Sequence, residues 1–590
     1  MIYEKINQNI YDYILNCNQN FKDRTALDYL GKTYTFKEVE ENINNVIKSL
    51  ISLGVKKGDN IAVLSLATPE FIYLMYASAK IGATLSILNP LDNSNYEKIL
   101  SDTNIKYLSC LDTFYNKVQA LIEHEKLMIL PFISSLPIVL RMLSGIKSLV
   151  NQDIISYRCT EWKKFLKKGE LINLPEFENF EENFNIIQIG TGGSTGIPKN
   201  VGLSNEMLNN IIYNHHLMNK SKNFDVSFND FETFLDVIPP HLAYGVCDVH
   251  LALSFRMKLC LEPIPDPKKF VNQLKKHNPH HVLAGPVHWK QMIGKKTFDL
   301  SNLKTAVAGG ERLENKDEVE INKILEKSNA KVKVKEGIGL TEIGGVGTFN
   351  TSDNLFTVGR PLPEYVVGIF KADTNDENYN NTKTTDELSK VFYTKNIEGD
   401  FDINLQGLPN LEGEICYQLP VKVLGYIGLE HEDENKKLLR VHEDGKVWVH
   451  TGDLGYINEN KNLIVSGRIK RIFNRYGWKI YPTYLSNIVT NSNLVKECVV
   501  VKRKSSDPKE SYVPVLYAVL KNEKDADKLK EYVVQNLKDN YKIYDIIIVE
   551  ELPKTTAGKI NFNLVEMYDS QNNEPATIKE LEVKKLTLLK

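Results

Sequence analysis

Hydrophobic and polar positions follow two different periods in the N-terminal part of the chain. Residues 35–53 carry their apolar side chains on one helical face, which predicts an amphipathic helix, and residues 70–81 are also predicted to be helical. Residues 60–66 and 84–88 are short apolar runs next to turn signals such as Gly-Asp and Gly-Ala, and we interpret them as strands. The same alternation returns over residues 231–340. Alternating strands and helices predict α/β units around a largely parallel sheet.

The pattern changes after about residue 470. The next hundred residues contain two helical and three strand-like segments: a helix from near Pro482, strands at 498–501 and 513–520, a helix at 525–537 and a strand at 543–549. A compact unit of this size is typical of a separate α+β domain.

We therefore divide the chain into three parts. An N-terminal α/β domain with parallel sheets is expected over residues 1–469, a small C-terminal α+β domain over 470–570, and a helix-like tail over 571–590. Two polar stretches, 373–387 and 430–437, lack an apolar period, so we predict that both are surface loops.

Composition excludes several classes of protein. The 590 residues include 73 Lys+Arg and 75 Asp+Glu, so bulk attraction to nucleic acid is not expected. The seven cysteines form no CxxC and no zinc-type spacing with histidine, which argues against a disulfide framework or structural zinc and favours a reducing, cytoplasmic compartment.

No targeting or membrane-spanning segment is predicted. The first residues lack a basic region followed by an apolar run. The longest uncharged apolar stretch, residues 127–140, contains two prolines and is too short to span a bilayer. With its amphipathic continuation to residue 150, it fits a buried helix and turn or a segment on a membrane surface. We favour the core, which leaves at most peripheral membrane contact.

The strongest local signal is the segment IIQIGTGGSTGIPK at residues 186–199. An apolar strand leads into glycines, which let backbone N–H groups converge on an anion, and into hydroxyls that donate further bonds. The segment is neither a Walker A motif nor a Rossmann fingerprint. We predict a polyphosphate-binding loop formed by Thr191, Gly192, Gly193, Ser194, Thr195, Gly196 and Lys199.

At this loop the sequence resembles the adenylate-forming (AMP-binding) superfamily, and in particular its acyl-CoA synthetases. The family signature is T-S-G-S/T-T-G-x-P-K-G; Gly192 replaces its second residue and Asn200 its last glycine. Further segments match in the family's order and spacing over nearly the whole chain: GGERL at 309–313, IGLTE at 338–342, GEI at 413–415, HTGD at 450–453, GRIKRIFNRYG at 467–477 and LPKTTAGKI at 552–560.

The resemblance implies roles for the middle motifs. Gly310 and Glu311 are expected beside the acyl group and adenine. The family's adenine-stacking tyrosine is Ile338 here, followed by Gly339. Thr341 and Glu342 are the last two residues of the IGLTE motif. We assign them catalytic roles, because the Thr341 hydroxyl can bond a phosphate oxygen and the Glu342 carboxylate can hold Mg²⁺.

The later motifs imply a nucleotide site shared by two domains. Asp453 is the expected ribose ligand, since an ionised carboxylate accepts two bonds, and Arg468 is expected near the ribose. Lys470 stands at the family's hinge, about which the mobile C-terminal domain rotates. Lys559 is the expected catalytic cation, because it can align and neutralise the carboxylate and the α-phosphate.

The acid is less constrained than the nucleotide. The segment VIPPHLAYG resembles the family's gate between acyl site and thiol tunnel, and His241 and Tyr244 are both candidates for the gating residue. Cys247 and Leu251 suggest an apolar site, and no aspartate is obviously placed to pair an amino group. A fatty or aromatic acid is therefore expected, with fatty acid metabolism slightly ahead.

The implied reaction uses ATP, Mg²⁺ and a carboxylic acid. Adenylation releases pyrophosphate, and a thiol then takes the acyl group and releases AMP. CoA is the first candidate for the thiol, and the phosphopantetheine of an acyl-carrier protein is the alternative. A nucleotide-binding protein without turnover is the rival from another class, motivated by the changes at Gly192, Ile338 and Arg471.

Overall fold

A computed structural model gives the fold of the chain. It describes residues 2–91, 93, 96–102, 104–132, 159–177, 180–191, 199–264, 266–351, 356–372, 386–476, 478–507, 510–538, 541–554, 559–573 and 582–585.

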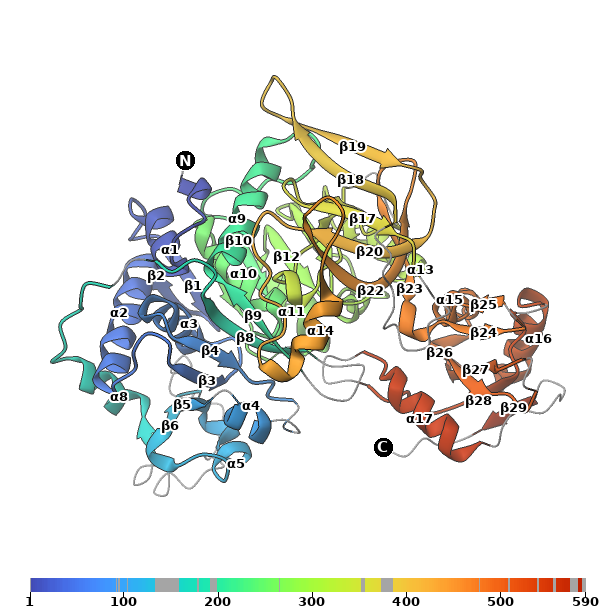
Figure 1. The fold of residues 1–590 in the computed structure, drawn as a ribbon, viewed down its shortest axis with the longest axis horizontal. Coiled ribbons are helices and arrows are strands. Elements are labelled where there is room, and N and C mark those ends of the chain that lie inside the picture. Colours follow the sequence, from blue (N-terminus) through green and yellow to red (C-terminus); the bar gives the residue numbers. More distant parts are fainter. Residues whose placement is uncertain are drawn as a thin grey trace.

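Two seven-stranded sheets form the greater part of the N-terminal domain (Figure 1). All pairs in the first sheet are parallel except the closing β8–β9 hairpin. Its strands, in spatial order, are β7 (Thr160–Glu161), β6 (Leu127–Leu130), β5 (Ile105–Leu111), β3 (Asn60–Leu64), β4 (Thr84–Ile87), β8 (Asn185–Thr191) and β9 (Lys199–Ser204).

The second sheet repeats this plan. Its pairs are parallel except for the β1–β2 hairpin. Its strands, in spatial order, are β14 (Val334–Glu336), β13 (Thr305–Ala308), β12 (His281–Ala284), β10 (Thr233–Asp236), β11 (Lys258–Leu261), β1 (Thr25–Tyr29) and β2 (Lys32–Thr35).

Helices cover the faces of both sheets. The central helices α3 and α10 are buried on nearly every side, because α3 packs on the first sheet, α10 on the second, and both contact α1. Their sequences are apolar all round, as buried helices are. The helices of this domain are α1 (Ile10–Asn18), α2 (Phe36–Ser52), α3 (Pro69–Ile81), α4 (Tyr96–Asp102), α5 (Tyr115–Val118), α8 (Trp162–Gly169), α9 (Asn205–Lys220), α10 (Ala243–Ser254), α11 (Phe270–His277), α12 (Pro286–Trp289) and α13 (Asn315–Lys327).

A third, antiparallel sheet follows β14 in the chain and was not anticipated from the sequence. Its order is β19 (Phe401–Gly407), β18 (Glu387–Lys395), β17 (Val366–Phe370), β20 (Gly413–Gln418), β22 (Val447–Ile457) and β21 (Leu439–Val441), with β23 (Leu463–Arg468) also pairing with β22. The ribbon β15 (Thr348–Phe349) and β16 (Arg360–Pro361) precedes it.

The C-terminal part has its own apolar cores. In β26, Cys498 and Val500 face α15 and α16, whereas Val499 and Val501 face α17, so the period of two sets the two faces of the sheet. Its elements are the ribbon β24 (Phe473–Arg475) and β25 (Trp478–Ile480), the sheet β26 (Val495–Lys504), β27 (Tyr512–Leu520), β28 (Asp545–Ile548) and β29 (Glu582–Lys585), and the helices α15 (Pro482–Asn491), α16 (Ala526–Asn536) and α17 (Phe562–Asn572).

The fold class is confirmed: a large N-terminal domain with parallel and mixed sheets and a small C-terminal α+β domain. The four elements predicted within residues 35–88 form as α2, β3, α3 and β4. The division at residues 470 and 571 stays a prediction.

Three local predictions differ from the structure. Residues 432–438 form a helix, α14 (Glu432–Leu438), and not a loop, because acidic residues lie in its first turn and lysines in its last, where they match the helix dipole. Residues 582–585 form strand β29 and not part of a helix-like tail, because they add in parallel to β28.

The apolar stretch at 127–140 begins as strand β6, whose four residues are all buried; residues 133–150 lie outside the described part, as do 373–385 of the predicted polar loop. Within the part of the chain that the structure describes, no helix is both long and apolar enough to cross a membrane.

Candidate active site

The two ends of the glycine-rich loop are fixed by the β8–β9 hairpin. Thr191 and Lys199 are register partners, and the Thr191 hydroxyl donates to the Lys199 carbonyl oxygen at 3.3 Å. Gly192, Gly193, Ser194, Thr195 and Gly196 lie outside the described residues, so their role in phosphate binding stays a prediction.

Lys199 is held by residues 425–427, which lie in the connection between strands β20 and β21. Backbone bonds join β9 to residues 425–427: Gly202 N–H donates to the Gly425 carbonyl at 3.0 Å, and Ile427 N–H donates to the Asn200 carbonyl at 2.8 Å. This pairing places the Tyr426 ring 4.6 Å from the Lys199 ammonium, a cation–π contact. The ammonium also lies 3.6 Å from a carboxylate oxygen of Glu434 on α14.

Glu342 shares the same tyrosine. The Tyr426 hydroxyl donates to a Glu342 carboxylate oxygen at 2.8 Å, and burial, together with the nearby Glu342 charge, raises the pKa of Tyr426 well above its ordinary value. The hydroxyl therefore remains a donor. Glu342 lies in a short 3₁₀ turn, Thr341–Ile343, and Gly339 just before it has no room for a side chain, since a Cβ there would lie 1.9 Å from the Gly345 carbonyl oxygen.

The donor set at Glu342 fits magnesium. Mg²⁺ takes oxygen ligands and is commonly held by one or two carboxylates together with substrate phosphates. Glu342 offers a carboxylate oriented by Tyr426, close to the lysine that ends the glycine-rich loop. Magnesium bound there would neutralise phosphate charge.

The Gly309–Gly310 pair leaves the carboxyl end of β13, and Gly310 has a φ of +84°, which favours glycine. Glu311 follows it, and burial raises the pKa of the Glu311 carboxyl, although Lys559 acts in the opposite direction. Ile338 follows β14, the neighbouring strand, and its N–H donates to the Thr348 hydroxyl at 3.1 Å. The two predicted nucleotide-side motifs thus leave adjacent strands at the same sheet edge.

Asp453 sits in a turn within β22 that several bonds hold. It is 6% exposed, and Arg468 on β23 contacts its carboxylate at 2.7 Å. Burial raises the pKa of Asp453, and Arg468 opposes the rise. Gly452 N–H donates to the buried Glu414 at 3.0 Å, and His450 lies 2.9 Å from the other oxygen of Glu414. The two side chains predicted to bind the ribose, Asp453 and Arg468, are therefore already paired with each other, and hydrogen bonds to Glu414 hold the segment that carries Asp453.

Lys559 of the C-terminal domain reaches this region. Desolvation lowers the pKa of Lys559; Glu311 and Asp453 oppose the shift through their negative charge, while Arg468 adds to it. All three belong to the N-terminal domain, so the structure brings Lys559 within electrostatic reach of the Gly309–Glu311 and His450–Asp453 segments. The interface is also bridged by Lys316 on α13, which donates to the Thr490 carbonyl of α15 at 3.1 Å.

Lys470 marks a concentration of positive charge at the same place. It follows β23 in a 3₁₀ turn, and desolvation lowers its pKa, with further lowering by Lys199, Lys437 and Arg468. Mutual repulsion among these cations costs free energy unless an anion lies between them. The arrangement therefore suits a polyphosphate.

The two gate candidates occupy different positions. His241 is 5% exposed, and burial lowers its pKa to about 4, which leaves the ring neutral. Tyr244, in the first turn of α10, lies against the glycine pair, because a Cβ on Gly309 would be 3.2 Å from its ring. Of the two, Tyr244 contacts the predicted acyl-side loop.

Comparison with known proteins decides the family. The family model described as "AMP-binding enzyme" matches residues 16–383, and the model described as "AMP-binding enzyme C-terminal domain" matches residues 485–559. This chain belongs to the AMP-binding enzyme family.

Relatives of this AMP-binding enzyme cover nearly its whole length. A long-chain-fatty-acid–CoA ligase of Bacillus subtilis is 25% identical over 574 residues, covering 94% of this chain and 93% of that protein. The 4-coumarate–CoA ligase CCL1 of Humulus lupulus is 23% identical over 568 residues, covering 93% and 92%.

Solved structures share the fold. The o-succinylbenzoate coenzyme A synthetase of Bacillus subtilis, in complex with ATP and magnesium ion, superposes with a TM-score of 0.70 at 18% identity, covering 94% of this chain and 99% of that one. An anthranilate CoA ligase in complex with anthranoyl-AMP gives 0.71 at 18% identity, covering 96% and 98%.

Sequence reasoning missed several residues of this AMP-binding enzyme's site. Tyr426 was not among the predicted site residues, yet it contacts both Glu342 and Lys199. Glu434 lies in the segment that was predicted as a surface loop, and Glu414 lies in the GEI motif, for which no site role was predicted. Tyr426 and Glu434 could have been recognised only from the pairing of residues 425–427 with β9.

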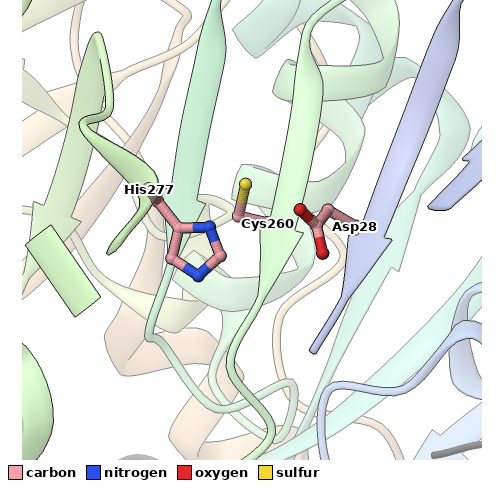
Figure 2. A group of neighbouring side chains, drawn as sticks. All are labelled: Asp28, Cys260 and His277. Carbon is pink, nitrogen blue, oxygen red and sulfur yellow. The ribbon is translucent and has the colours of Figure 1, made fainter. Parts of the chain in front are cut away.

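In the described part of the chain, His, Cys and carboxylate side chains come together in two groups whose members show no motif-like spacing in the sequence. Asp28, Cys260 and His277, from β1, β11 and the end of α11, have ligand atoms within 4.8 Å of one another (Figure 2). Glu414, Cys416 and His450 form the second group, behind the Asp453 turn. Neither could be predicted, since each combines residues far apart in the sequence: in the second group Glu414 and Cys416 lie on β20 and His450 lies on β22.

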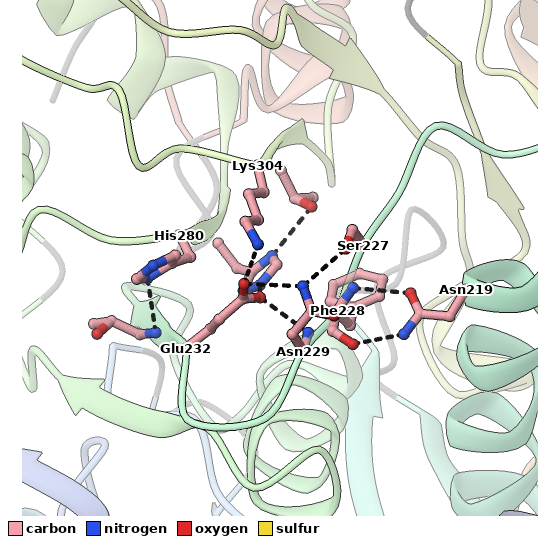
Figure 3. Close-up of polar contacts among 10 residues, drawn as sticks. Asn219, Ser227, Phe228, Asn229, Glu232, His280 and Lys304 are labelled. Carbon is pink, nitrogen blue, oxygen red and sulfur yellow. Dashed lines mark hydrogen bonds and ion pairs between the residues drawn. The ribbon is translucent and has the colours of Figure 1, made fainter.

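The opposite, amino edge of the second sheet carries a polar network instead of a site. Glu232, just before β10, binds His281 at 2.7 Å and also Lys304, and accepts from the backbone of Asn229 at 2.9 Å (Figure 3). Although burial acts to raise the pKa of Glu232, these hydrogen bonds lower it to about 2. The network stabilises the edge that faces away from the Gly309–Gly310 pair.

Proposed function

We propose that this AMP-binding enzyme is an ATP-dependent carboxylate ligase of the AMP-forming acid–CoA ligase type. It adenylates a carboxylic acid and transfers the acyl group to a thiol, which we infer to be CoA. One observation carries the proposal: Lys559 of the C-terminal domain lies within electrostatic reach of Glu311, Asp453 and Arg468 of the N-terminal domain, and Arg468 is also within reach of Lys470. The named relatives, which are CoA ligases, support the same chemistry.

In the first half-reaction, a carboxylate oxygen bonds to the α-phosphorus of ATP and the bond to the β-phosphate oxygen breaks. Lys199 and the glycine-rich loop would hold the departing pyrophosphate, with Thr341 bonding a phosphate oxygen and Glu342 holding Mg²⁺. Asp453 would accept from the two ribose hydroxyls, beside Arg468. Two anions approach each other in this step, so the cation of Lys559 would lower the barrier by neutralising them.

In the second half-reaction, a thiol sulfur attacks the acyl carbon and the bond to the AMP oxygen breaks. Lys559 has to leave for the thiol to approach, so the C-terminal domain would rotate at Lys470, a hinge motion. Lys470 is suited to this because it follows the last strand of the third sheet. A cytoplasmic location and the absence of a nucleic-acid partner remain predictions, as does the limit to peripheral membrane contact.

The test is pyrophosphate release from Mg·ATP with a panel of fatty, aryl and amino acids, each with and without CoA. Acid-dependent release followed by AMP and a CoA thioester is the expected result. Release without a CoA-dependent thioester, but with loading of a carrier protein, would contradict CoA as the acceptor. ATP binding without release from any acid would identify a nucleotide-binding protein without turnover and refute the proposal.

A further inference from the structure

Five polar residues stand at or after the carboxyl ends of β10 and β12, and we call them the polar cluster: Asp236, His241, Tyr244, Asp248 and His288. The sheet topology explains why they share one edge. Parallel strands β10, β12 and β13 are neighbours, and their carboxyl ends lead respectively into Asp236, Gly285 and Gly309. Ligands of α/β sheets bind at this edge.

Short distances tie the cluster to the glycine pair. A Cβ on Gly309 would lie 3.2 Å from the Tyr244 ring, and a Cβ on Gly285 would lie 3.6 Å from Nδ1 of His288 and 4.0 Å from the Gly309 carbonyl oxygen. Asp248 is one turn after Tyr244 on α10, so both side chains lie on the same helical face. The cluster therefore borders the loop that we place beside the acyl group.

Several polar atoms of the cluster have no protein partner among the described residues. Five buried atoms are in this position: Oδ2 of Asp236, Nδ1 of His241, the Tyr244 hydroxyl oxygen and both carboxyl oxygens of Asp248. Each buried polar atom without a partner costs about 1–3 kcal/mol. A concentration of such atoms at one sheet edge indicates a site built for a polar ligand.

Among the described residues, no cation compensates the charge of the two aspartates. Asp236 is 1% and Asp248 0% exposed. Burial raises the pKa of Asp248 well above its ordinary value, and the neighbouring Asp236 raises it further; burial also raises the pKa of Asp236 to about 7. Only the Ile238 N–H, which donates to Asp236 at 3.0 Å, opposes this. A bound cation would favour ionisation of both carboxyls.

We propose that the carboxylic acid substrate carries a protonated amine, which Asp248 and Asp236 bind at the end of the acyl site remote from ATP. This inference rests on the proposed ligase function and names its substrate class. An ammonium group has three donors, and the two aspartates have three carboxyl oxygens without a partner. A hydroxyl has one donor and no charge, so it would leave most of the cluster unsatisfied.

The position of Asp248 limits the length of the acid. The four-residue step from Tyr244 to Asp248 corresponds to about 6 Å along the helix, measured away from the Gly309 loop. In an α-amino acid the amine is only two bonds from the carboxyl carbon. The site therefore fits an acid whose amine is separated from the carboxylate by a chain or ring of several bonds. This proposal differs from the expectation of a fatty or aromatic acid, for which Cys247 and Leu251 suggested an apolar site and no aspartate was obviously placed to pair an amino group.

The experiment compares acids matched in length. Pyrophosphate release would be measured with 4-aminobutanoate, 6-aminohexanoate and 8-aminooctanoate, with their hydroxy and unsubstituted counterparts, and with 4-aminobenzoate against benzoate. We expect at least one amino acid of this set to exceed its hydroxy and unsubstituted counterparts by on the order of 10- to 10²-fold in kcat/KM, the range for a hydrogen bond to a charged group.

Variants test whether Asp248 is the specificity-determining residue. Asp248→Asn keeps the shape and removes the charge, and should abolish the preference for the amine, read as the ratio of kcat/KM for the amino acid to kcat/KM for the unsubstituted acid in the same variant. Glu318→Gln is the matched control, since Glu318 is also buried, has an unpartnered oxygen and lies on α13 away from the cluster. The preference should survive in it. Should Asp248→Asn fail to fold, Asp236→Asn and the wild-type panel give the same comparison.

The outcomes separate the two proposals. Release from unsubstituted or hydroxy acids equal to or above that from amino acids would overturn this inference and leave the ligase function intact. A preference for amines that persists in Asp248→Asn and Asp236→Asn would also overturn it. Failure of every acid, in this set and in the wider panel, would contradict the ligase function itself.

Discussion

The contact between Tyr426 and Glu342 gives the sharpest prediction about the ATP site. Tyr426→Phe removes only the hydroxyl that donates to Glu342 at 2.8 Å and retains the ring that lies 4.6 Å from the Lys199 ammonium. Any effect can therefore be assigned to the orientation of the Glu342 carboxylate and not to the cation–π contact.

The magnitude follows from the charge of the acceptor. A hydrogen bond to an ionised group contributes about 1.5–3 kcal/mol, and each 1.4 kcal/mol corresponds to about tenfold in an equilibrium constant. Water can partly replace the hydroxyl at a half-buried position. We therefore expect kcat/KM for Mg·ATP to fall by on the order of tenfold, with a higher requirement for Mg²⁺ because the carboxylate is less well oriented.

A double-mutant cycle with Glu342→Gln is the decisive assay, read as pyrophosphate release at several Mg²⁺ concentrations. If Tyr426 acts through Glu342, the Phe substitution should have little further effect in the Gln background, and the coupling should exceed about 1 kcal/mol. Tyr365→Phe is the control, since this buried tyrosine also has a hydroxyl, but one without a partner among the described residues. Additive effects, with coupling below about 0.5 kcal/mol, would refute the reasoning.

Three further predictions test other parts of the molecule. Lys559→Ala should slow adenylation by on the order of 10²- to 10³-fold, the range for one lost transition-state contact, while ATP binding by titration changes little; undiminished pyrophosphate release would exclude the assigned role. Lys470→Pro should impair thioester formation more than adenylation, because it restricts the backbone at the hinge; equal losses in both half-reactions would argue against a hinge there. The hydrogen bonds of Glu232 lower its pKa in the folded protein from 4.5 to about 2. The ionised carboxylate therefore stabilises the fold by about 3 kcal/mol at pH values above 4.5. This stabilisation is lost as the pH falls from 4.5 toward 2. Thermal unfolding of Glu232→Gln should show a lower midpoint at pH 7 and a smaller decline over that window, and an unchanged pH profile would contradict the network.

The elements of the two parallel sheets could be predicted because burial imposes a local pattern. Helix α3 and strands β3 and β4 have nearly uniform burial, and apolar runs of the right length encode that directly. The helix α14 was missed since its seven residues have no apolar face, and its stability depends on dipole-matched charges. Strand β29 depends on pairing with β28, 34 residues earlier at closest, which no local pattern reveals.

The candidate site divides in the same way. Motif residues such as Lys199, Glu342, Asp453 and Lys559 are recognisable because phosphate, metal and ribose need particular side chains at fixed spacing in one segment. Partners such as Tyr426 and Glu434 come from other elements, so the sequence gives no local sign of them.

The sequence by itself predicted the chemistry: which side chains could hold a polyphosphate, a magnesium ion and a ribose, and that two domains would share them. The tertiary structure decided everything that depends on side chains from different strands. It placed Lys559 near Glu311 and Asp453, and it brought Asp236 and Asp248 together at the carboxyl edge of the second sheet. The physical reason is that burial and proximity set the charge and the hydrogen-bonding need of a group, and both are properties of the packed fold, so a proposal about the acid could be argued only from the tertiary structure.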